Sequence, residues 1–191
     1  ATLGPRLVEL SGLDDLRREL VSLAERTAPA ADHDRPRLWV DRSFAARGSG
    51  TVVTGTLTGG TLSVDQRVDV VPAGHQARVR SLQRHGRSET SIGPGNRVAV
   101  NLSGVEHQQI ERGDALVLGT QWRPSRRVDA SLDVLEALDH EVSRRGAYVA
   151  YVGSGEWPVK VRILGPDAIL PGDHGLVRLH LSRPLPLMVG D

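Results

Sequence analysis

The sequence predicts a mainly β protein with two antiparallel β-barrel domains, preceded by one amphipathic helix. Three observations predict this fold: apolar residues recur at every second position after residue 36, Gly, Pro and Asp clusters separate these short segments, and a single helical repeat precedes them. The 191 residues suffice for one ordinary domain or two small ones. Hydrophobic residues make up 39% and charged residues 25%, which argues against collagen-like, coiled-coil and wholly disordered chains.

The helical repeat is the first element of the chain. Its apolar residues lie 3, 4 and 3 positions apart and share one helical face: Leu13, Leu16, Leu20 and Leu23. We expect Ser11 to be the N-cap, with acidic residues in the first turn, where the helix dipole favours them. Residues 28–36 are polar, contain proline and have no period, so they are predicted to form a linker.

The segments with alternating apolar residues are typical of half-buried antiparallel strands. Their apolar members are Val68 and Val70; Val98, Val100 and Leu102; Val159, Val161 and Ile163; and Val177, Leu179 and Leu181. A further strand is expected over residues 51–57, with no bulky side chain at Gly55. The polar, Pro-containing stretch 121–127 divides the β region, so two small β domains fit better than one.

Several kinds of chemistry find no support in the sequence. The chain has no Cys, which excludes disulfides, zinc–cysteine sites and a thiol nucleophile. Its seven His include no HExxH motif, so no metal site is predicted, and the chain contains neither a Walker loop nor a G-x-S-x-G serine. The glycine-rich residues 48–60 do not match a dinucleotide fingerprint. We therefore predict no catalytic, metal-binding or nucleotide-binding residue in this chain, which is not expected to be an enzyme by itself.

Basic residues concentrate in the middle of the chain. The net charge is −2 over residues 1–36, +6 over 37–127 and −3 over 128–191. This distribution favours an anionic partner for the middle segment, and a solvated Arg-rich surface is the alternative. No apolar run approaches the roughly 20 residues that span a bilayer, so no membrane partner is expected.

Three stretches resemble the second, β-barrel domain of translational GTPases. They are residues 40–55 (VDRSFAARGSGTVVTG), 93–105 (GPGNRVAVNLSGV) and 110–116 (IERGDAL). Residues 170–191 similarly resemble the third domain of elongation-factor-Tu-like proteins. The resemblance implies that residues 1–36 are the C-terminal helix of a GTPase domain plus a linker, residues 37–122 are domain II and residues 123–191 are a C-terminally truncated domain III.

Within that superfamily, the chain resembles the selenocysteine-specific elongation factors (SelB). Asp41 is followed by Arg42 where the general factor typically has a second acid, and Arg97 stands where the general factor has an asparagine. Residues 76–89 also resemble a strand pair of that family, while Asp65-Gln66 departs from its usual Gly-Asp turn. The resemblance implies that Asp41, Arg42 and Arg97 line the pocket that receives the aminoacyl group.

The resemblance also implies a function and partners. This chain would bind the aminoacyl and acceptor end of selenocysteinyl-tRNA for delivery to the ribosome at recoded UGA codons. The whole protein would be a cytoplasmic GTPase that uses GTP and Mg²⁺ and binds a messenger hairpin through a C-terminal domain, whereas these residues would hold no cofactor. Two alternatives remain open: a fragment of another translational GTPase that handles ordinary aminoacyl-tRNA, and a β-barrel protein-interaction module without a tRNA role.

The charges of the implied pocket have a chemical rationale. A selenol is more acidic than a thiol, so selenocysteine is largely an anion at pH 7, whereas serine is neutral. Opposite charges about 4 Å apart at an effective dielectric near 20 attract by about 4 kcal/mol before desolvation, and half of that would discriminate roughly thirtyfold. Arginine suits this task because it stays charged when partly desolvated.

Strand geometry sets a condition on this pocket. Strict alternation along residues 38–43 would point Asp41 and Arg42 to opposite faces, so we expect a distortion near Phe44 to Gly48. Arg97 is expected opposite the core face of its strand. The alternative interpretation is that Asp41 and Arg42 form an exposed ion pair worth at most about 1 kcal/mol.

Overall fold

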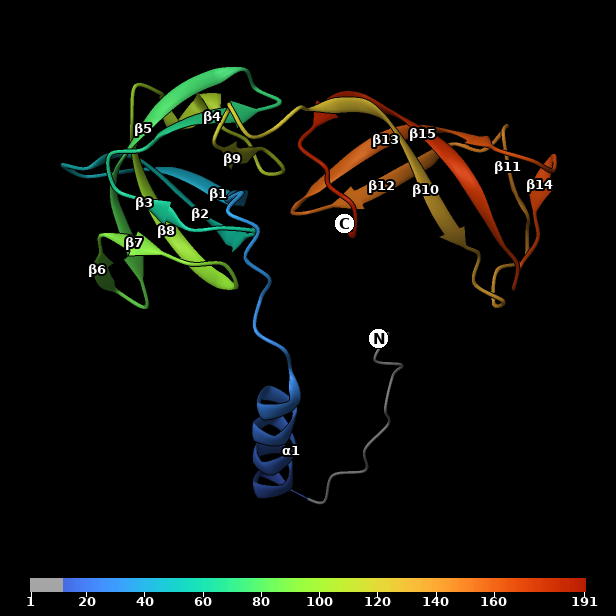
Figure 1. Ribbon diagram of the computed structural model, residues 1–191, viewed down its shortest axis with the longest axis horizontal. Coiled ribbons are helices and arrows are strands. Elements are labelled where there is room, and N and C mark those ends of the chain that lie inside the picture. The colour runs from blue at the N-terminus through green and yellow to red at the C-terminus, as the bar shows by residue number, and fades with distance from the viewer. Residues whose placement is uncertain (1–11) are drawn as a thin grey trace. The chain divides into compact units, whose positions relative to one another are not determined.

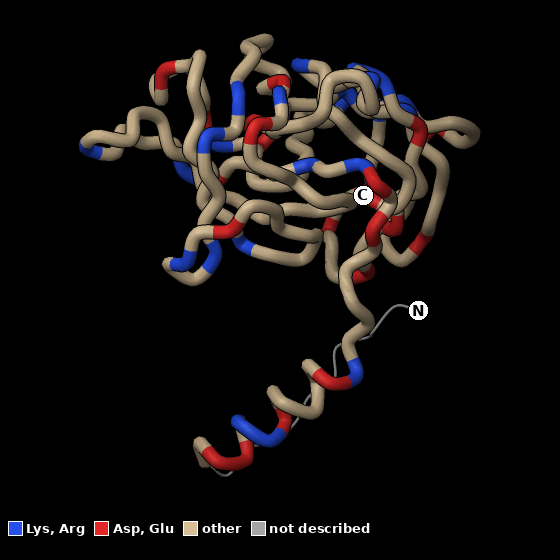
Figure 2. The backbone as a smooth tube through the Cα atoms, turned by 60° about the vertical axis from the view of Figure 1, so that its left-hand side comes forward, with Lys and Arg blue, Asp and Glu red and all other residues tan. Residues whose placement is uncertain are grey.

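The computed structural model describes residues 12–191, which belong to two compact units that divide between Ala30 and Ala31 (Figure 1). The first unit contains helix α1 (Leu13–Arg26), at the position that the helical repeat predicts. Its N-cap is Gly12, one residue later than expected. Ser11, the N-cap that the sequence predicts, lies outside the described residues. Asp14 and Asp15 occupy the first turn of α1, and Figure 2 shows acidic and basic residues alternating along it.

The second unit begins with a closed antiparallel barrel, here called the first β module. Its elements are β1 (Arg37–Ala46), β2 (Gly50–Thr58), β3 (Leu62–Ser63), β4 (Arg67–Val71), β5 (His75–Arg84), β6 (Arg87–Glu89), β7 (Ser91–Ile92), β8 (Asn96–Ser103), the 3-10 helix η1 (His107–Gln109) and β9 (Ala115–Val117). The strand order is β4-β9-β1-β2-β8-β5-β6, and an additional β4–β5 pairing closes the sheet on itself. β3 pairs with β7 in a separate two-stranded ribbon.

The core of the first β module follows the predicted alternation. Val98, Val100 and Leu102 on β8 are at most 2% exposed, while their neighbours in the sequence point outward. Gly55 lies opposite Val40, and a Cβ on this glycine would come within 2.0 Å of the Trp39 carbonyl oxygen. The close approach of β1 and β2 therefore requires glycine at this position.

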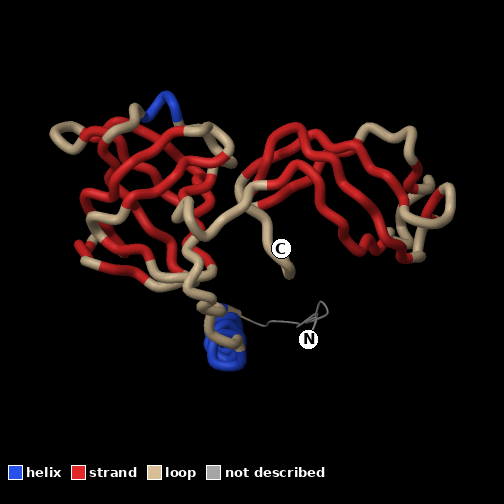
Figure 3. The backbone as a smooth tube through the Cα atoms, turned by 45° about the horizontal axis from the view of Figure 1, so that its top comes forward, coloured by secondary structure: helices blue, strands red, loops and turns tan. Residues whose placement is uncertain are grey.

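The remaining strands form the second β module. They are β10 (Ser125–Asp133), β11 (Val142–Ser143), β12 (Tyr148–Val152), β13 (Gly155–Ile163), β14 (Ala168–Ile169) and β15 (His174–Leu185). A four-stranded sheet has the order β10-β15-β13-β12, and β11 pairs with β14. Figure 3 shows both β modules as strands joined by loops and turns. The predicted periodicity of β13 and β15 is observed, because Val161, Ile163, Val177 and Leu181 are buried. β10 already begins at Ser125, within the stretch 121–127 that was expected to separate the modules.

Polar contacts connect the two β modules. The Ser154 hydroxyl donates to the Val40 carbonyl at 2.5 Å, and Arg112 Nε donates to the Ser154 carbonyl at 2.9 Å. Arg37 is 4% exposed, and its guanidinium donates to the Pro186 carbonyl at 2.7 Å and to the carboxylate of Asp191. These contacts join β1 and the segment before β9 to the turn after β12 and to residues 186–191.

The predicted fold class is confirmed: the chain is mainly β, with two β modules after one helix. Within residues 12–191, no helix has the length and hydropathy needed to cross a membrane.

Candidate functional site

A β-bulge places Asp41 and Arg42 on the outer surface of the first β module. Val40 pairs with Gly55 and Arg42 pairs with Thr54, so Asp41 is an extra residue in β1. A bulge changes which face the following side chains occupy. The expected distortion therefore exists, but it lies between Val40 and Arg42 rather than near Phe44 to Gly48.

The residues after the bulge show its effect. Without it, Arg42 would point into the barrel, whereas it is exposed in the structure. Ser43 pairs with the fully buried Val53, and its hydroxyl turns inward to donate to the His107 carbonyl at 2.8 Å. The bulge thus places Ser43 at the inward position that Arg42 would otherwise occupy. The Ser43 hydroxyl has a hydrogen-bond acceptor there, whereas a guanidinium would be buried in the barrel.

Asp41 lies at the centre of a four-residue cluster that it forms with Arg42, Thr54 and Arg97. Both guanidinium Nη atoms of Arg97 donate to the two oxygens of the Asp41 carboxylate, and Arg97 Nη2 lies 3.0 Å from Oδ1. The Thr54 hydroxyl donates to the same Oδ1 at 2.6 Å and lies 3.4 Å from Arg97 Nη2. The carboxylate is therefore held by a two-point ion pair and by a hydroxyl donor at once.

Strand register explains why these side chains meet. Arg42 faces Thr54 and Arg97 faces Thr56, and the two threonines lie two residues apart on β2, so all four residues share one face. As predicted, Arg97 lies opposite the core face of β8, and its side chain is 56% exposed. The structure thus brings the three predicted site residues together, although they come from strands far apart in the sequence.

The electrostatics of the cluster favour ionised groups. Partial burial raises the pKa of Asp41, but the hydrogen bonds from Arg97 and Thr54, with the charges of Arg97 and Arg42, outweigh it and hold this pKa below its ordinary value. The hydrogen bond and charge of Asp41 raise the pKa of Arg97. Asp41 is paired with Arg97 and not with Arg42, so the alternative of a simple Asp41–Arg42 ion pair does not describe the structure.

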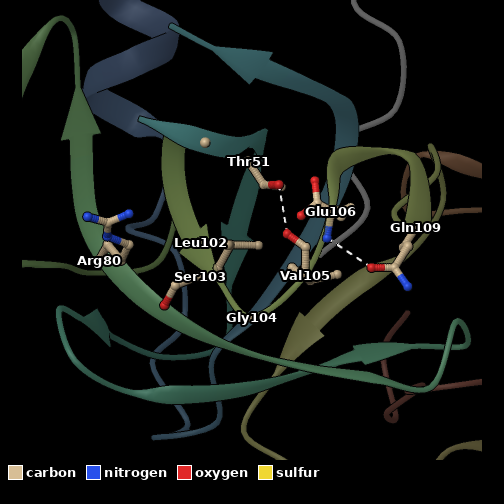
Figure 4. A pocket seen from close by; sticks show the side chains of 9 residues that line it. Thr51, Arg80, Leu102, Ser103, Gly104, Val105, Glu106 and Gln109 are labelled. Carbon is tan, nitrogen blue, oxygen red and sulfur yellow. Dashed lines mark hydrogen bonds between the residues drawn. The ribbon is translucent and has the colours of Figure 1, made fainter. Parts of the chain in front are cut away.

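Two hollows on the surface lie elsewhere. A cavity of about 350 Å³ is lined by Arg127, Asp129 and Arg178 on the second β module. Another, of about 320 Å³, lies on the first β module, where Thr51 donates to the Val105 carbonyl and Gln109 accepts from the Glu106 amide (Figure 4). Neither includes Asp41, Arg42 or Arg97. The predicted site is open to solvent, because Arg42 is exposed and the Arg97 side chain is 56% exposed.

Thr54 is the member of the cluster that sequence reasoning missed. The segment 51–57 is predicted to be a strand, and its alternation places Thr54 outward, but nothing in the sequence says that its hydroxyl meets a carboxylate of β1.

Among the described residues, no group of three or more His, Asp or Glu side chains is arranged to hold a metal ion.

Comparison with known proteins identifies the family. Residues 50–117 match the model of elongation factor Tu domain 2. The selenocysteine-specific elongation factor of Desulfomicrobium baculatum is 35% identical over 95% of this chain and 28% of its own length. The protein of the same name from Escherichia coli (strain K12) is 36% identical over 63% of this chain and 20% of its own. The chain belongs to the family of selenocysteine-specific elongation factors.

A solved structure agrees with this assignment at the level of the fold. The crystal structure of a bacterial selenocysteine-specific elongation factor superposes with a TM-score of 0.76 at 24% identity and covers 93% of this chain and 28% of that one. This chain spans less than a third of the length of the two curated relatives described above. What those whole proteins do therefore reaches this chain only by proposal.

Proposed function

We propose that this chain binds the aminoacyl and acceptor end of selenocysteinyl-tRNA, for delivery to the ribosome at recoded UGA codons. The observation that carries the proposal is the outward cluster in which a bulge brings Asp41 and Arg42 beside Arg97. Residues 37–122 would supply this cluster as domain II, between a GTPase-domain helix and linker (1–36) and domain III (123–191).

The chemistry of the cluster suits an anionic side chain. Three charged groups give a local net charge of +1, and Arg42 is exposed on the same face. An ionised selenol would meet this positive charge, whereas the neutral hydroxyl of serine would gain less from it. The cluster would therefore select by charge and not by size.

The whole protein would act with partners that this chain does not contain. It would be a cytoplasmic protein that binds and hydrolyses GTP with Mg²⁺ in an upstream domain. It would also bind the ribosome, and it would bind a messenger hairpin through a further C-terminal domain. The role proposed for residues 37–191 is binding.

The proposal is tested by the affinities of the full-length, GTP-bound protein for selenocysteinyl-tRNA and seryl-tRNA. Arg42→Ala and Arg97→Ala should each weaken binding of selenocysteinyl-tRNA about tenfold or more and leave seryl-tRNA nearly unchanged. Arg87→Ala, in the exposed β5–β6 hairpin, is the matched control and should not alter the preference. Equal losses for both tRNAs would mean that the arginines bind the tRNA backbone, as in a factor for ordinary aminoacyl-tRNA. Affinity for a protein alone would favour an interaction module.

A further inference from the structure

The two arginines of the cluster are in different states. Arg97 is engaged through both Nη atoms with the Asp41 carboxylate, whose side chain is 18% exposed. The side chain of Arg42 is exposed and forms no hydrogen bond or ion pair with another side chain or backbone group in the described part of the chain. The charge of Arg97 is thus already balanced, and the unbalanced positive charge of the cluster lies on Arg42.

Asp41 has two cations within electrostatic reach. Both Arg97 and Arg42 lower its pKa through their charges, and Arg42 is its neighbour in the sequence. A carboxylate between two guanidiniums can pair with either, because rotation about its side-chain bonds lets it change rotamer. Something must therefore fix which arginine it neutralises.

Thr54 is placed to fix this choice. Its hydroxyl donates to Asp41 Oδ1 at 2.6 Å, and Arg97 Nη2 donates to the same oxygen at 3.0 Å. The threonine also faces Arg42 directly across the β1–β2 pair without a hydrogen bond between the two side chains. Its β-branched side chain has restricted rotamers, so the hydroxyl direction is stiffly held by β2.

We infer that Thr54 is a positioning residue: it holds Asp41 on Arg97 and thereby keeps Arg42 unpaired as the cation that meets an anionic aminoacyl side chain. This inference rests on the proposed function for its ligand, but the geometry that it assigns to Thr54 is independent of any tRNA. Without the hydroxyl, Asp41 would divide its time between the two arginines. Arg42 would then be partly neutralised, and a negative charge would stand where the ligand's anion has to approach.

The first test concerns this chain alone and needs no tRNA. The pH is lowered to protonate Asp41, and the NMR signals of the arginine guanidinium groups are followed. The proteins compared are the wild type, Thr54→Val and Thr54→Ser. In the wild type and in Thr54→Ser, the titration should shift the signals of Arg97 far more than those of Arg42. In Thr54→Val, the titration should shift the signals of Arg42 about as much as those of Arg97. A response confined to Arg97 in Thr54→Val would overturn the positioning role.

The second test measures selectivity in the full-length, GTP-bound protein. Thr54→Val should weaken selenocysteinyl-tRNA binding roughly five- to tenfold and change seryl-tRNA binding less than about twofold, and Thr54→Ser should restore the preference. Thr56→Val is the matched control, because Thr56 faces Arg97 from the same strand face and its hydroxyl has no hydrogen bond with the described residues. Equal effects of the two valine variants would contradict the inference. A wild type without any preference would refute the proposed function, while the NMR experiment still decides the role of Thr54.

Discussion

The two β modules use the same alternation of apolar and polar residues but enclose their cores to different degrees. On β8 of the first module, the inward residues Val98 and Val100 are at most 1% exposed, whereas Val159 and Val161 on β13 of the second are 8% and 9% exposed. The first sheet closes through the β4–β5 pairing, while β10 and β12 are the outer strands of the four-stranded sheet. Closure removes edges and fixes the register of every strand in the ring. A cluster that depends on a single bulged residue is therefore better supported on the closed module.

The largest effect is expected at Gly55, which lets β1 and β2 approach beside the bulge. In Gly55→Ala, the new Cβ would lie 2.0 Å from the Trp39 carbonyl oxygen and 2.7 Å from Leu38 Cδ2, and backbone cannot yield cheaply. We expect a loss of about 3 kcal/mol or more in the free energy of unfolding, measured by urea denaturation. Gly93→Ala is the control, because its Cβ would meet only the Thr61 hydroxyl at 3.8 Å. A small loss in Gly55→Ala would show that the strands of the closed module can separate without cost.

A second pair of variants tests the difference between the cores directly. Val100→Ala removes the same atoms from the first module that Val161→Ala removes from the second, but Val100 is 0% exposed and Val161 is 9% exposed. The expected losses are about 2 kcal/mol for Val100→Ala and about 1 kcal/mol for Val161→Ala, because cavity cost rises with enclosure. Denaturant unfolding of both variants provides the measurement. Losses in the reverse order would contradict the view that closure makes the first core the tighter one.

The third comparison uses two arginines that each form a fork with an aspartate. Arg37 is buried between Trp39 and Trp122, with its guanidinium carbon 5.0 Å from each ring centre, and it bonds Asp191. Arg178 bonds Asp129 at 2.7 and 2.8 Å on the exposed face of the second module. Lysine keeps the charge but loses the planar fork and the stacking. Arg37→Lys should therefore lower stability by about 2 kcal/mol, whereas Arg178→Lys should cost less than about 1 kcal/mol.

Thermal unfolding of these two lysine variants, at the same salt concentration, provides the measurement. Added salt should reduce the loss of stability caused by Arg178→Lys and leave the loss caused by Arg37→Lys nearly unchanged. The reason is that solvent ions screen exposed ion pairs more than buried ones. Equal losses would mean that the contact between Arg37 and the end of the chain contributes no more than a surface pair.

Local patterns predicted much of this molecule. The helix over residues 13–26 and the strands around Val98 and Val161 follow from periodicity, because burial on one face imposes it. The predicted N-cap is wrong by one residue, since Gly12 and not Ser11 is the N-cap of the helix. Short strands such as β11, with only two residues, carry too little pattern to be predicted.

The candidate site shows where sequence reasoning stops. Asp41, Arg42 and Arg97 were found through a resemblance, but the position of the bulge depends on how β1 pairs with β2, which alternation along one strand does not contain. The hydroxyl of Thr54 was missed for the same reason, since its partner lies on another strand. The burial of Arg37 depends on residues at the far end of the chain. Contacts between distant segments, rather than local preferences, thus decide the geometry of the site.

The smallest expected effect is a difference between the modules in how their stability depends on pH. One aspartate in each module contributes, and the two contributions have opposite signs. Asp114 of the first module is 2% exposed, and burial raises its pKa above the ordinary 3.8 despite the hydrogen bond from the Glu111 amide. Its ionisation therefore opposes folding, so this stability contribution falls as pH rises from about 3.8 through the folded-state pKa. Asp129 of the second module is exposed, and the hydrogen bond from Arg178 lowers its pKa. Its contribution is present above the ordinary value and is lost as pH falls through the lowered one.

Asparagine variants at these two positions should therefore respond in opposite ways. Relative to the wild type, Asp114→Asn should become more stable as pH rises from 3 to about 6, because it removes the buried charge while the amide oxygen still accepts from Glu111. Asp129→Asn should become slightly less stable over the same range. Urea denaturation at several pH values measures both slopes. Equal slopes of stability against pH for the two variants would mean that Asp114 is as well hydrated as Asp129. The core of the closed module would then not exclude water more than the second module does.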